Sequence, residues 1–179
     1  MHIKKMLLFA TIIVFALGLT SCTSYRGTLL DKDNDDEIAE IRLQKIIEAI
    51  ENKDKDALKS MFSINAVQEA NDIDGGIDYI MDFYKGKFIS KEGSIQRSDS
   101  NDHGKKTSEL RNFSRVTTDN DKYIIFFVDK IEDTENPDNI GLYMIQIIKL
   151  TDREKYFDWG QGKSRCAGIF IPSDTNVEN

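Results

Sequence analysis

Cysteine and histidine are scarce in this 179-residue sequence, which contains two of each. Two cysteines allow one disulfide at most, so a fold held by several disulfides is excluded and stability must come from a hydrophobic core. Long apolar runs are also lacking. The longest, Met6–Leu19, is shorter than the ~20 residues that a membrane-spanning helix needs, and the later ones are the size of strands.

The N-terminus has the zones of a secretory signal: Lys4 and Lys5, the apolar run 6–19 and then small polar residues. The sequence LTSC at 19–22 resembles a lipobox, the cleavage and modification motif of bacterial lipoproteins. The resemblance implies a signal peptide over 1–21 and a lipid on Cys22, which anchors the chain at the extracytoplasmic face of the cell membrane. The alternative is a plain secretory signal in which Cys22 is incidental.

Acidic residues outnumber basic ones, and loss of the signal peptide increases the difference. Residues 1–21 contain two lysines and no acids, so cleavage leaves 22 basic and 31 acidic residues, a formal charge of −9. A domain with this charge is repelled by nucleic acid, which disfavours nucleic-acid binding. Lipidation of Cys22 also leaves Cys166 without a cysteine partner inside the chain.

A short charged segment follows Cys22. Residues 22–36 read as the lipidated cysteine and a flexible acidic linker. Asp31, Asp33 and Asp35 alternate as at the start of a calcium loop, but Asp36 and Arg42 stand where such a loop needs glycine and glutamate. We therefore expect a solvated linker, a single domain over 37–172 and a disordered tail over 173–179.

Helical patterns fill the first part of this domain. The strongest is one apolar stripe at helical spacing, formed by Ala39, Leu43, Ile46, Ile47 and Ile50. Asn52 or Asp54 can cap a second helix, Ser63 a third, and Asp74 precedes a fourth amphipathic run that Gly86 can end.

Strand patterns follow, over 88–97, 109–118, 122–132, 139–150 and 168–171. Helices first and strands afterwards, with hairpin-length links, predict an α+β domain with N-terminal helices packed on a curled, mostly antiparallel sheet. We expect parallel βαβ architecture to be excluded, because no helix-length segments separate the strands. The third and fourth strands are apolar at consecutive positions, so both sheet faces need a cover. A helix, a curled sheet or a second subunit can supply it, and a homodimer through this face is a hypothesis.

Four segments carry a resemblance to a known family: IIEAIENKDKDALKSMFS, DIDGGIDYIMDFYKG, ENPDNIGLYMIQIIKL and GIFIP. They resemble uncharacterised lipoproteins of low-GC Gram-positive bacteria that carry domain of unknown function 5104. The resemblance covers roughly Glu37 to Pro172 and includes the lipobox. It implies a cystatin-like, nuclear-transport-factor-2-like fold and a lipid-anchored location, and it brings no catalytic residues with it.

Few motifs in the sequence indicate catalysis. GQGKS at 160–164 ends like a phosphate-binding loop, but Phe157 occupies the position of its first glycine, so we expect a polar turn. A thiol site would need Cys166 and His103 together, and no feature of the sequence joins them; we expect a packed thiol. The same scarcity leaves no usual zinc ligand set. We therefore expect no metal and no cofactor.

One carboxylate is a candidate for chemistry in a pocket. Asp129 shares a strand face with Tyr123, and an aspartate in an apolar pocket has a raised pKa. Some ketosteroid-isomerase-like enzymes of the fold implied by the resemblance use such an acid. The alternative, which we favour, is Asp129 facing water near a strand end, because charged residues are seldom buried unpaired.

Basic and aromatic residues supply further candidates. Arg111 and Arg115 on one strand, with Tyr143 and Trp159, can line a mouth for an anionic or aromatic ligand. Their alternative role is to balance acids on neighbouring strands.

Three functions remain after these exclusions. The first is a non-catalytic ligand- or protein-binding module tethered to the membrane. The second is a pocket enzyme with a carboxylate base, and the third is a structural assembly subunit. We favour the binding module, and therefore no enzyme activity, because no site for catalysis stands out.

Lipidation is directly testable. Labelled palmitate should enter the wild-type protein and should not enter Cys22→Ala, because the thioether needs the cysteine sulfur. Gel autoradiography of the immunoprecipitated protein measures it. Label that enters both proteins, or neither, would contradict the anchor.

Overall fold

The computed structural model describes residues 23–162 and 164–173. The predicted signal peptide, Cys22 and most of the predicted tail lie outside the described residues. The chain divides into two units, 1–37 and 38–179, and the sheet and both cores belong to the second. None of the described helices is long and apolar enough to cross a membrane.

Helix α2 (Thr23–Glu51) carries the predicted apolar stripe. All five residues of the stripe are buried, which confirms the prediction. The helix begins at Thr23, however, within the segment for which we expected an irregular linker. The segment contains no proline, and extension of an existing helix costs little compared with its nucleation, so a polar sequence can continue it.

Three shorter helices follow: α3 (Lys55–Ser60), α4 (Ile64–Glu69) and α5 (Ile73–Phe83). Asp54 and Ser63 cap the first two, as predicted, by accepting hydrogen bonds from the N–H groups of Ala57 and Ala66. We expected α5 to follow Asp74, but it begins at Ile73 and its cap is Asp72. Asp72, and not Asp74, accepts from an N–H of the first turn, that of Gly75, at 2.8 Å.

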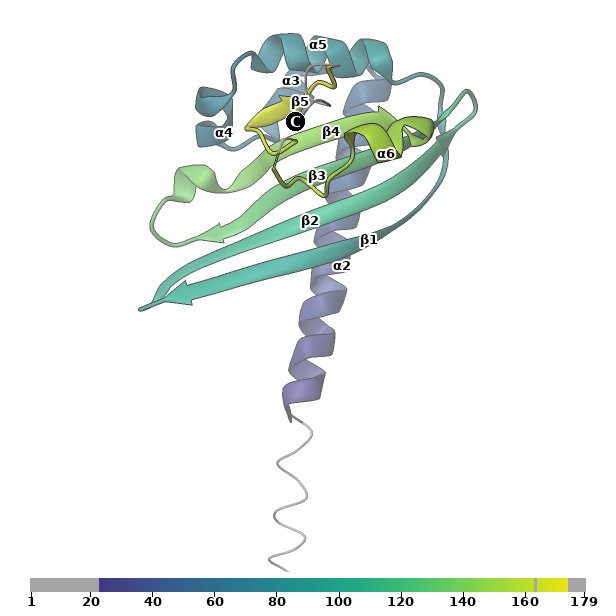
Figure 1. The fold of residues 1–179 in the computed structure, drawn as a ribbon. Helices are drawn as coiled ribbons and strands as arrows, with labels where there is room; N and C mark the ends of the chain where they lie inside the picture. Colours follow the sequence, from purple (N-terminus) through teal and green to yellow (C-terminus); the bar gives the residue numbers. More distant parts are fainter. Residues whose placement is uncertain (1–22, 163, 174–179) are drawn as a thin grey trace, which may run out of the picture. The chain divides into compact units, whose positions relative to one another are not determined.

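The sheet contains β1 (Phe88–Asp102), β2 (Lys105–Thr118), β3 (Lys122–Asp133), β4 (Gly141–Lys149) and β5 (Gly168–Phe170), in that order across the sheet. The first four strands pair antiparallel (Figure 1). The domain is therefore α+β with a mostly antiparallel sheet, as predicted.

The hairpin of β1 and β2 is longer than we predicted. Residues read as a polar loop continue both strands up to the two-residue turn at His103 and Gly104, where both residues have positive φ. Such a turn matches the twist of a hairpin and needs no apolar residues. The polar character of these residues reflects the exposure of the strands.

One pair of strands is parallel, although we expected no parallel units. β4 and β5 are parallel, with Ile145 opposite Ile169. Their connection contains the short helix α6 (Arg153–Tyr156) and runs over the sheet, so a crossover is possible without a long helix.

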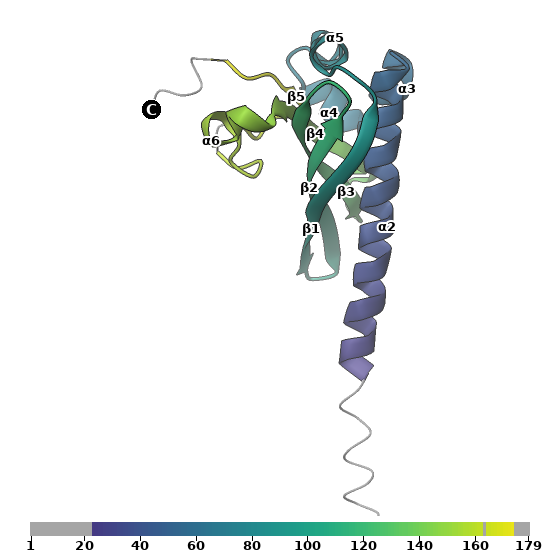
Figure 2. The same cartoon turned by 90° about the vertical axis from the view of Figure 1, so that its right-hand side faces the viewer.

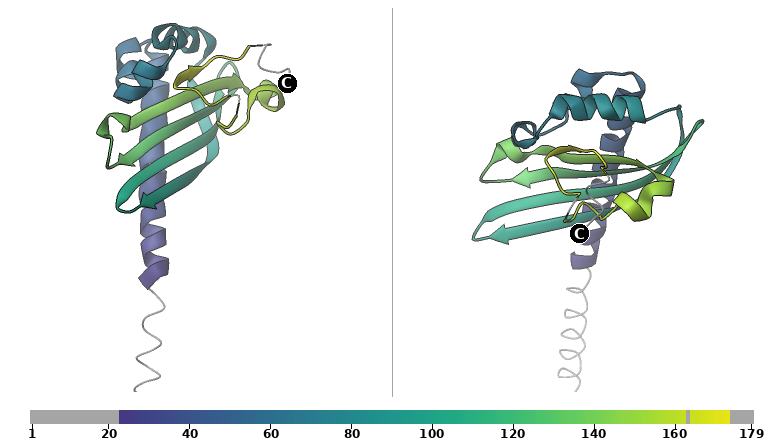
Figure 3. Two further views of the ribbon diagram at one scale, coloured as in Figure 1. Left: turned by 60° about the vertical axis from the view of Figure 1, so that its left-hand side comes forward. Right: turned by 45° about the horizontal axis from the view of Figure 1, so that its top comes forward.

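Two apolar cores lie on opposite faces of the sheet. Helix α2 covers one face and α6 with its flanking segments covers the other, as Figure 2 shows, while α3–α5 group beside β4 and β5 (Figure 3). Phe126 belongs to the α6 side, where Phe157 packs on its ring. Gly160 lies so close that a Cβ would be 2.5 Å from that ring. The segment between β4 and β5 therefore covers the second apolar face within one chain.

The cap of α5 provides a test of the corrected helix start. Asp72→Ala should lower the free energy of unfolding by about 1 kcal/mol, because the Gly75 N–H loses its acceptor. Asp74→Ala removes an exposed ion pair with Lys59 and should cost roughly half as much or less. Urea denaturation of both variants measures the difference. Equal losses, or a larger loss for Asp74→Ala, would contradict the observed cap.

Candidate functional site

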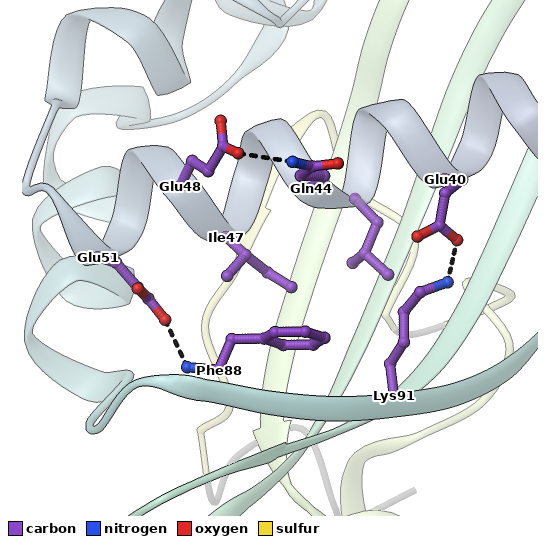
Figure 4. Close-up of a pocket in the computed structure, with 8 residues that line it drawn as sticks. Glu40, Gln44, Ile47, Glu48, Glu51, Phe88 and Lys91 are labelled. Carbon is purple, nitrogen blue, oxygen red and sulfur yellow. Dashed lines mark hydrogen bonds and ion pairs between the residues drawn. The ribbon is translucent and has the colours of Figure 1, made fainter.

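A groove of about 460 Å³ lies between α2 and the start of β1 (Figure 4). Its walls are two short stretches far apart in sequence, six residues of the helix and two of the strand. They are Glu40, Leu43, Gln44, Ile47, Glu48, Glu51, Phe88 and Lys91.

The apolar surface of the groove comes from three side chains. Ile47 points from α2 toward the strand (Figure 4). Leu43 also lines the groove, and both residues belong to the core. Phe88 lies opposite them and is 41% exposed, unusually high for a phenylalanine beside a core. Leu43 and Ile47 are buried, so the exposed apolar contact area of the groove comes mainly from Phe88.

The polar rim is mainly acidic. Glu40 pairs with Lys91 across the groove, and Glu51 accepts a 2.6 Å hydrogen bond from the backbone N–H of Phe88. Glu48 accepts only from the neutral Gln44 side chain, at 2.8 Å. Glu51 also pairs with the Lys87 ammonium at 3.2 Å. Three carboxylates thus face two ammonium groups, and the net negative charge of the rim favours a cationic ligand.

The carboxylate candidate from the sequence lies elsewhere. Asp129 is 1% exposed, which corrects the interpretation that it faces water. Arg42 of α2 donates to it through Nε at 2.7 Å and through Nη2 at 3.4 Å. Burial raises the pKa of the Asp129 carboxyl, and the Arg42 charge partly opposes the rise. The expectation that a buried charge needs a partner is therefore met by Arg42.

Tyr123, the neighbour that we predicted for Asp129, has a structural environment. It is buried in the core on the same sheet face as Ile125 and Phe127. Its hydroxyl accepts from the Lys85 N–H at 2.9 Å, and its ring stacks on Tyr84 at 4.9 Å. Tyr123 therefore joins the end of α5 to the sheet and lines none of the three grooves described here.

The basic and aromatic candidates occupy the opposite, α6-side face. Arg115 pairs with Glu92, its direct partner on β1, at 3.0 Å. Arg111 pairs with Glu109 at 2.8 Å, and Glu109 also binds Arg165. Arg115 therefore balances an acid on the neighbouring strand, as the alternative predicted, and Arg111 also has an acidic partner.

Two aromatic candidates share that face without forming a mouth with the arginines. The Tyr143 ring lies 4.9 Å from the Lys130 ammonium and 5.1 Å from the Arg165 guanidinium. Trp159 packs 5.2 Å from Phe113 and keeps 37% of its surface exposed. The six candidate residues are thus split between two faces of the sheet, and the structure does not bring them into one pocket.

The remaining motifs behave as polar turns and packed groups. Asp158 accepts from the N–H groups of Gln161 and Ser164, both at 3.2 Å, so the GQGKS segment turns around a carboxylate and not around a phosphate. Cys166 is a half-buried free thiol whose pKa is raised by burial. His103 is in the hairpin turn. Among the described residues no group of three His, Cys, Asp or Glu is placed to hold a metal ion.

Two further grooves are lined mainly by polar residue types. One, of about 430 Å³, is lined by α2 and α3 and includes Arg42 and Lys45. The other, of about 450 Å³, surrounds the turn between β2 and β3. Neither combines buried aliphatic side chains with an exposed aromatic ring, so the groove between α2 and β1 is our candidate site.

The sequence contains a signal for this groove that we did not use. Glu40, Gln44, Ile47 and Glu51 follow one another at helical spacing and form a second stripe beside the core stripe. From the sequence alone, its polar members indicate only the part of the helix surface that lies off the core. Pairing this stripe with Phe88 and Lys91 required the tertiary structure.

The fold and the groove define an α+β domain whose activity no motif specifies. The model of one family, Domain of unknown function (DUF5104), matches residues 45–150, more than half of the chain. The chain belongs to the DUF5104 family. No curated protein matches the sequence significantly.

The ion pair of Arg42 and Asp129 gives a prediction about stability and pH. Arg42→Ala should lower the free energy of unfolding by about 3 kcal/mol at pH 7, because the buried carboxylate loses the cation that pairs with it. A carboxylate whose folded pKa is raised costs stability above that pKa and nothing below its unfolded pKa of about 4. The loss should therefore shrink as the pH falls toward that value.

Urea denaturation between pH 4 and pH 7 measures this dependence. Lys45→Ala removes an exposed cation from the same helix and is the matched control, with an expected change within about 0.5 kcal/mol. The double variant Arg42→Met with Asp129→Leu should regain stability and lose the pH dependence. If Arg42→Ala loses the same free energy of unfolding at pH 4 and at pH 7, the uncompensated charge of Asp129 is not the cause of the loss.

Proposed function

We propose that this protein is a membrane-anchored extracytoplasmic lipoprotein whose domain is a non-catalytic binding module, with the groove between α2 and β1 as its binding site. The observation that carries the proposal is the combination of buried aliphatic side chains, an exposed phenylalanine and an acidic rim in one groove. Apolar contact area with a few placed polar groups is the usual composition of a ligand site. Cys22 supplies the membrane anchor.

The ligand class follows from the chemistry of the rim and walls. Glu40 and Glu51 are paired with Lys91 and Lys87. Glu48 has no basic partner among the described residues, so the rim carries a net negative charge that favours a cation. Leu43, Ile47 and Phe88 favour aliphatic or aromatic groups next to that cation. We therefore infer a ligand with basic and apolar groups side by side, such as a segment of a basic protein.

Binding is better supported than catalysis. Asp129, the most deeply buried carboxylate among the described residues, is held by two hydrogen bonds from Arg42 and lies outside the three grooves. A general base needs access to the proton that it removes. A carboxylate that is engaged and enclosed in this way lacks such access.

The arrangement of helix and sheet supports the fold family that the resemblance implies. A long helix across one face of an antiparallel sheet agrees with a cystatin-like, nuclear-transport-factor-2-like domain. Activity differs widely among proteins that share a fold, so the binding proposal depends on the groove.

A charge-neutralised groove tests the proposed function. The probe is a fluorescein-labelled peptide that alternates lysine and valine over eight residues, and the protein is the full-length chain in non-ionic detergent. Glu40→Gln, Glu48→Gln and Glu51→Gln combined should weaken its binding by about tenfold, since each partly exposed ion pair contributes 0.2–1 kcal/mol. Fluorescence anisotropy measures the dissociation constant.

The control removes equal charge elsewhere. Glu69→Gln, Glu135→Gln and Glu154→Gln change three exposed glutamates outside the groove. This variant should bind the probe within about twofold of wild type in 0.15 M salt, because charges beyond a Debye length are screened. If the two triple variants lose affinity equally, the attraction comes from overall charge and the groove is not the site.

A further inference from the structure

Strand β1 forms an edge of the sheet. In the described part of the chain it pairs only with β2, and its fifteen residues are exposed except for the half-buried Ile95. A strand at an edge leaves alternate backbone N–H and C=O groups without a strand partner. The directions in which the backbone N–H and C=O groups of β2 point determine which residues of β1 carry these groups.

Two hydrogen bonds fix the directions of the backbone groups in β2. The Thr118 N–H donates to the Asp121 carbonyl at 2.9 Å, and the Lys106 carbonyl accepts from the Thr134 N–H at 3.0 Å. Both bonds point toward β3, and both β2 residues have even numbers. Backbone groups alternate in direction along a strand, so the odd-numbered residues of β2 point toward β1.

The register then assigns the groups of β1. Phe113 of β2 stands opposite Ser94, so Ser94 and the other even-numbered residues from Ser90 onward bond to β2. A register shift between Phe88 and Ser90 reverses this alternation at Phe88. The N–H and C=O groups of Lys91, Gly93 and Ile95 point away from the sheet. None of these three N–H groups donates to another element in the part of the chain that the structure describes.

This edge begins in the groove. At Phe88 the outward N–H is already bound by the Glu51 carboxylate, and Lys91 lines the groove three residues later. An acceptor on a ligand can bond to the next outward N–H groups in the same way. The groove and the open edge are therefore continuous parts of one surface.

We propose that the occupant is an extended, cationic segment of a partner protein, which adds to the edge of β1 as a further strand. The inference rests on the proposed function of the groove and names the form of its ligand. Main-chain hydrogen bonds to Lys91, Gly93 and Ile95 hold the segment, and alternate side chains face α2. Its basic side chains meet Glu40 and the other groove carboxylates, and its apolar ones contact Phe88.

Charge complementarity favours an extended segment with this composition. One face of an added strand repeats every second residue, so lysines or arginines on that face pass the helix carboxylates in succession. An acidic segment would meet the net negative charge of the groove and would be repelled. A second copy of this chain is the alternative occupant, and the experiment separates it.

Backbone methylation of the probe peptide tests strand addition. Only every second N–H of an added strand bonds to the edge, so two peptides are compared with the parent, one N-methylated at all lysines and the other at all valines. One of them should bind the full-length protein more than about tenfold more weakly, and the other within about threefold of the parent. Fluorescence anisotropy measures all three.

The outcomes separate this inference from the proposed function. Equal effects of the two methylation patterns, with binding still dependent on the groove glutamates, would overturn strand addition and leave the groove as the site. Loss of the glutamate dependence itself would overturn both. A concentration-dependent dimer that the peptide does not dissociate would identify a second copy as the occupant and would also overturn the inference.

A protein variant tests the same hydrogen bonds from the other side. Ile95→Pro removes one outward N–H, which an edge strand tolerates, and it should weaken peptide binding more than about fivefold. Ile95→Ala removes the same packing contact and keeps the N–H, so it should bind within about twofold of wild type. Equal affinities of the two variants, with unchanged circular dichroism, would contradict the assigned directions. If Ile95→Pro does not fold, the methylated peptides decide the question.

Discussion

The burial of one stripe of helix α2 against the sheet is the contact on which both the core and the groove depend. Leu43, Ile46 and Ile50 are inaccessible to solvent, and they fix the rotation of the helix about its axis. With 3.6 residues per turn, Glu40 and Glu51 must then lie on the flank of the helix beside β1. The position of the acidic rim thus follows from how the core is packed. A different rotation of α2 about its axis would remove both the core contact and the rim.

The same periodic patterns explain how much could be predicted from the sequence. The spacing of the α2 stripe and the consecutive apolar residues of β3 gave correct elements because burial imposes a period on each. Residues without such a period were harder: the polar ends of β1 and β2 read as a loop, and the helix start at Asp72 was placed two residues late. In these segments backbone hydrogen bonds decide the structure, and they leave little trace in composition.

The candidate site shows a different limit. Asp129 and Arg111 were considered for one pocket, but the strand register places them on opposite faces, and register depends on partners distant in sequence. The groove joins residues 40–51 to residues 88–91, and no local pattern contains both parts. Cover of the second face by the segment around α6 was also left open, since that segment has no apolar period. The segment around α6 covers this apolar face of β3, so a second subunit is not needed to cover it.

The charges of β1 connect the stability of the free protein with the selection of a ligand. A long exposed edge invites pairing with other chains, and charged side chains on the edge oppose it. In β1 this protection comes from Lys91 and Glu92, with the α2 carboxylates beside them. Opposed charges of this kind repel a strand with the wrong pattern and attract one with the complementary pattern. A single arrangement can therefore keep the free edge soluble and make binding to it selective.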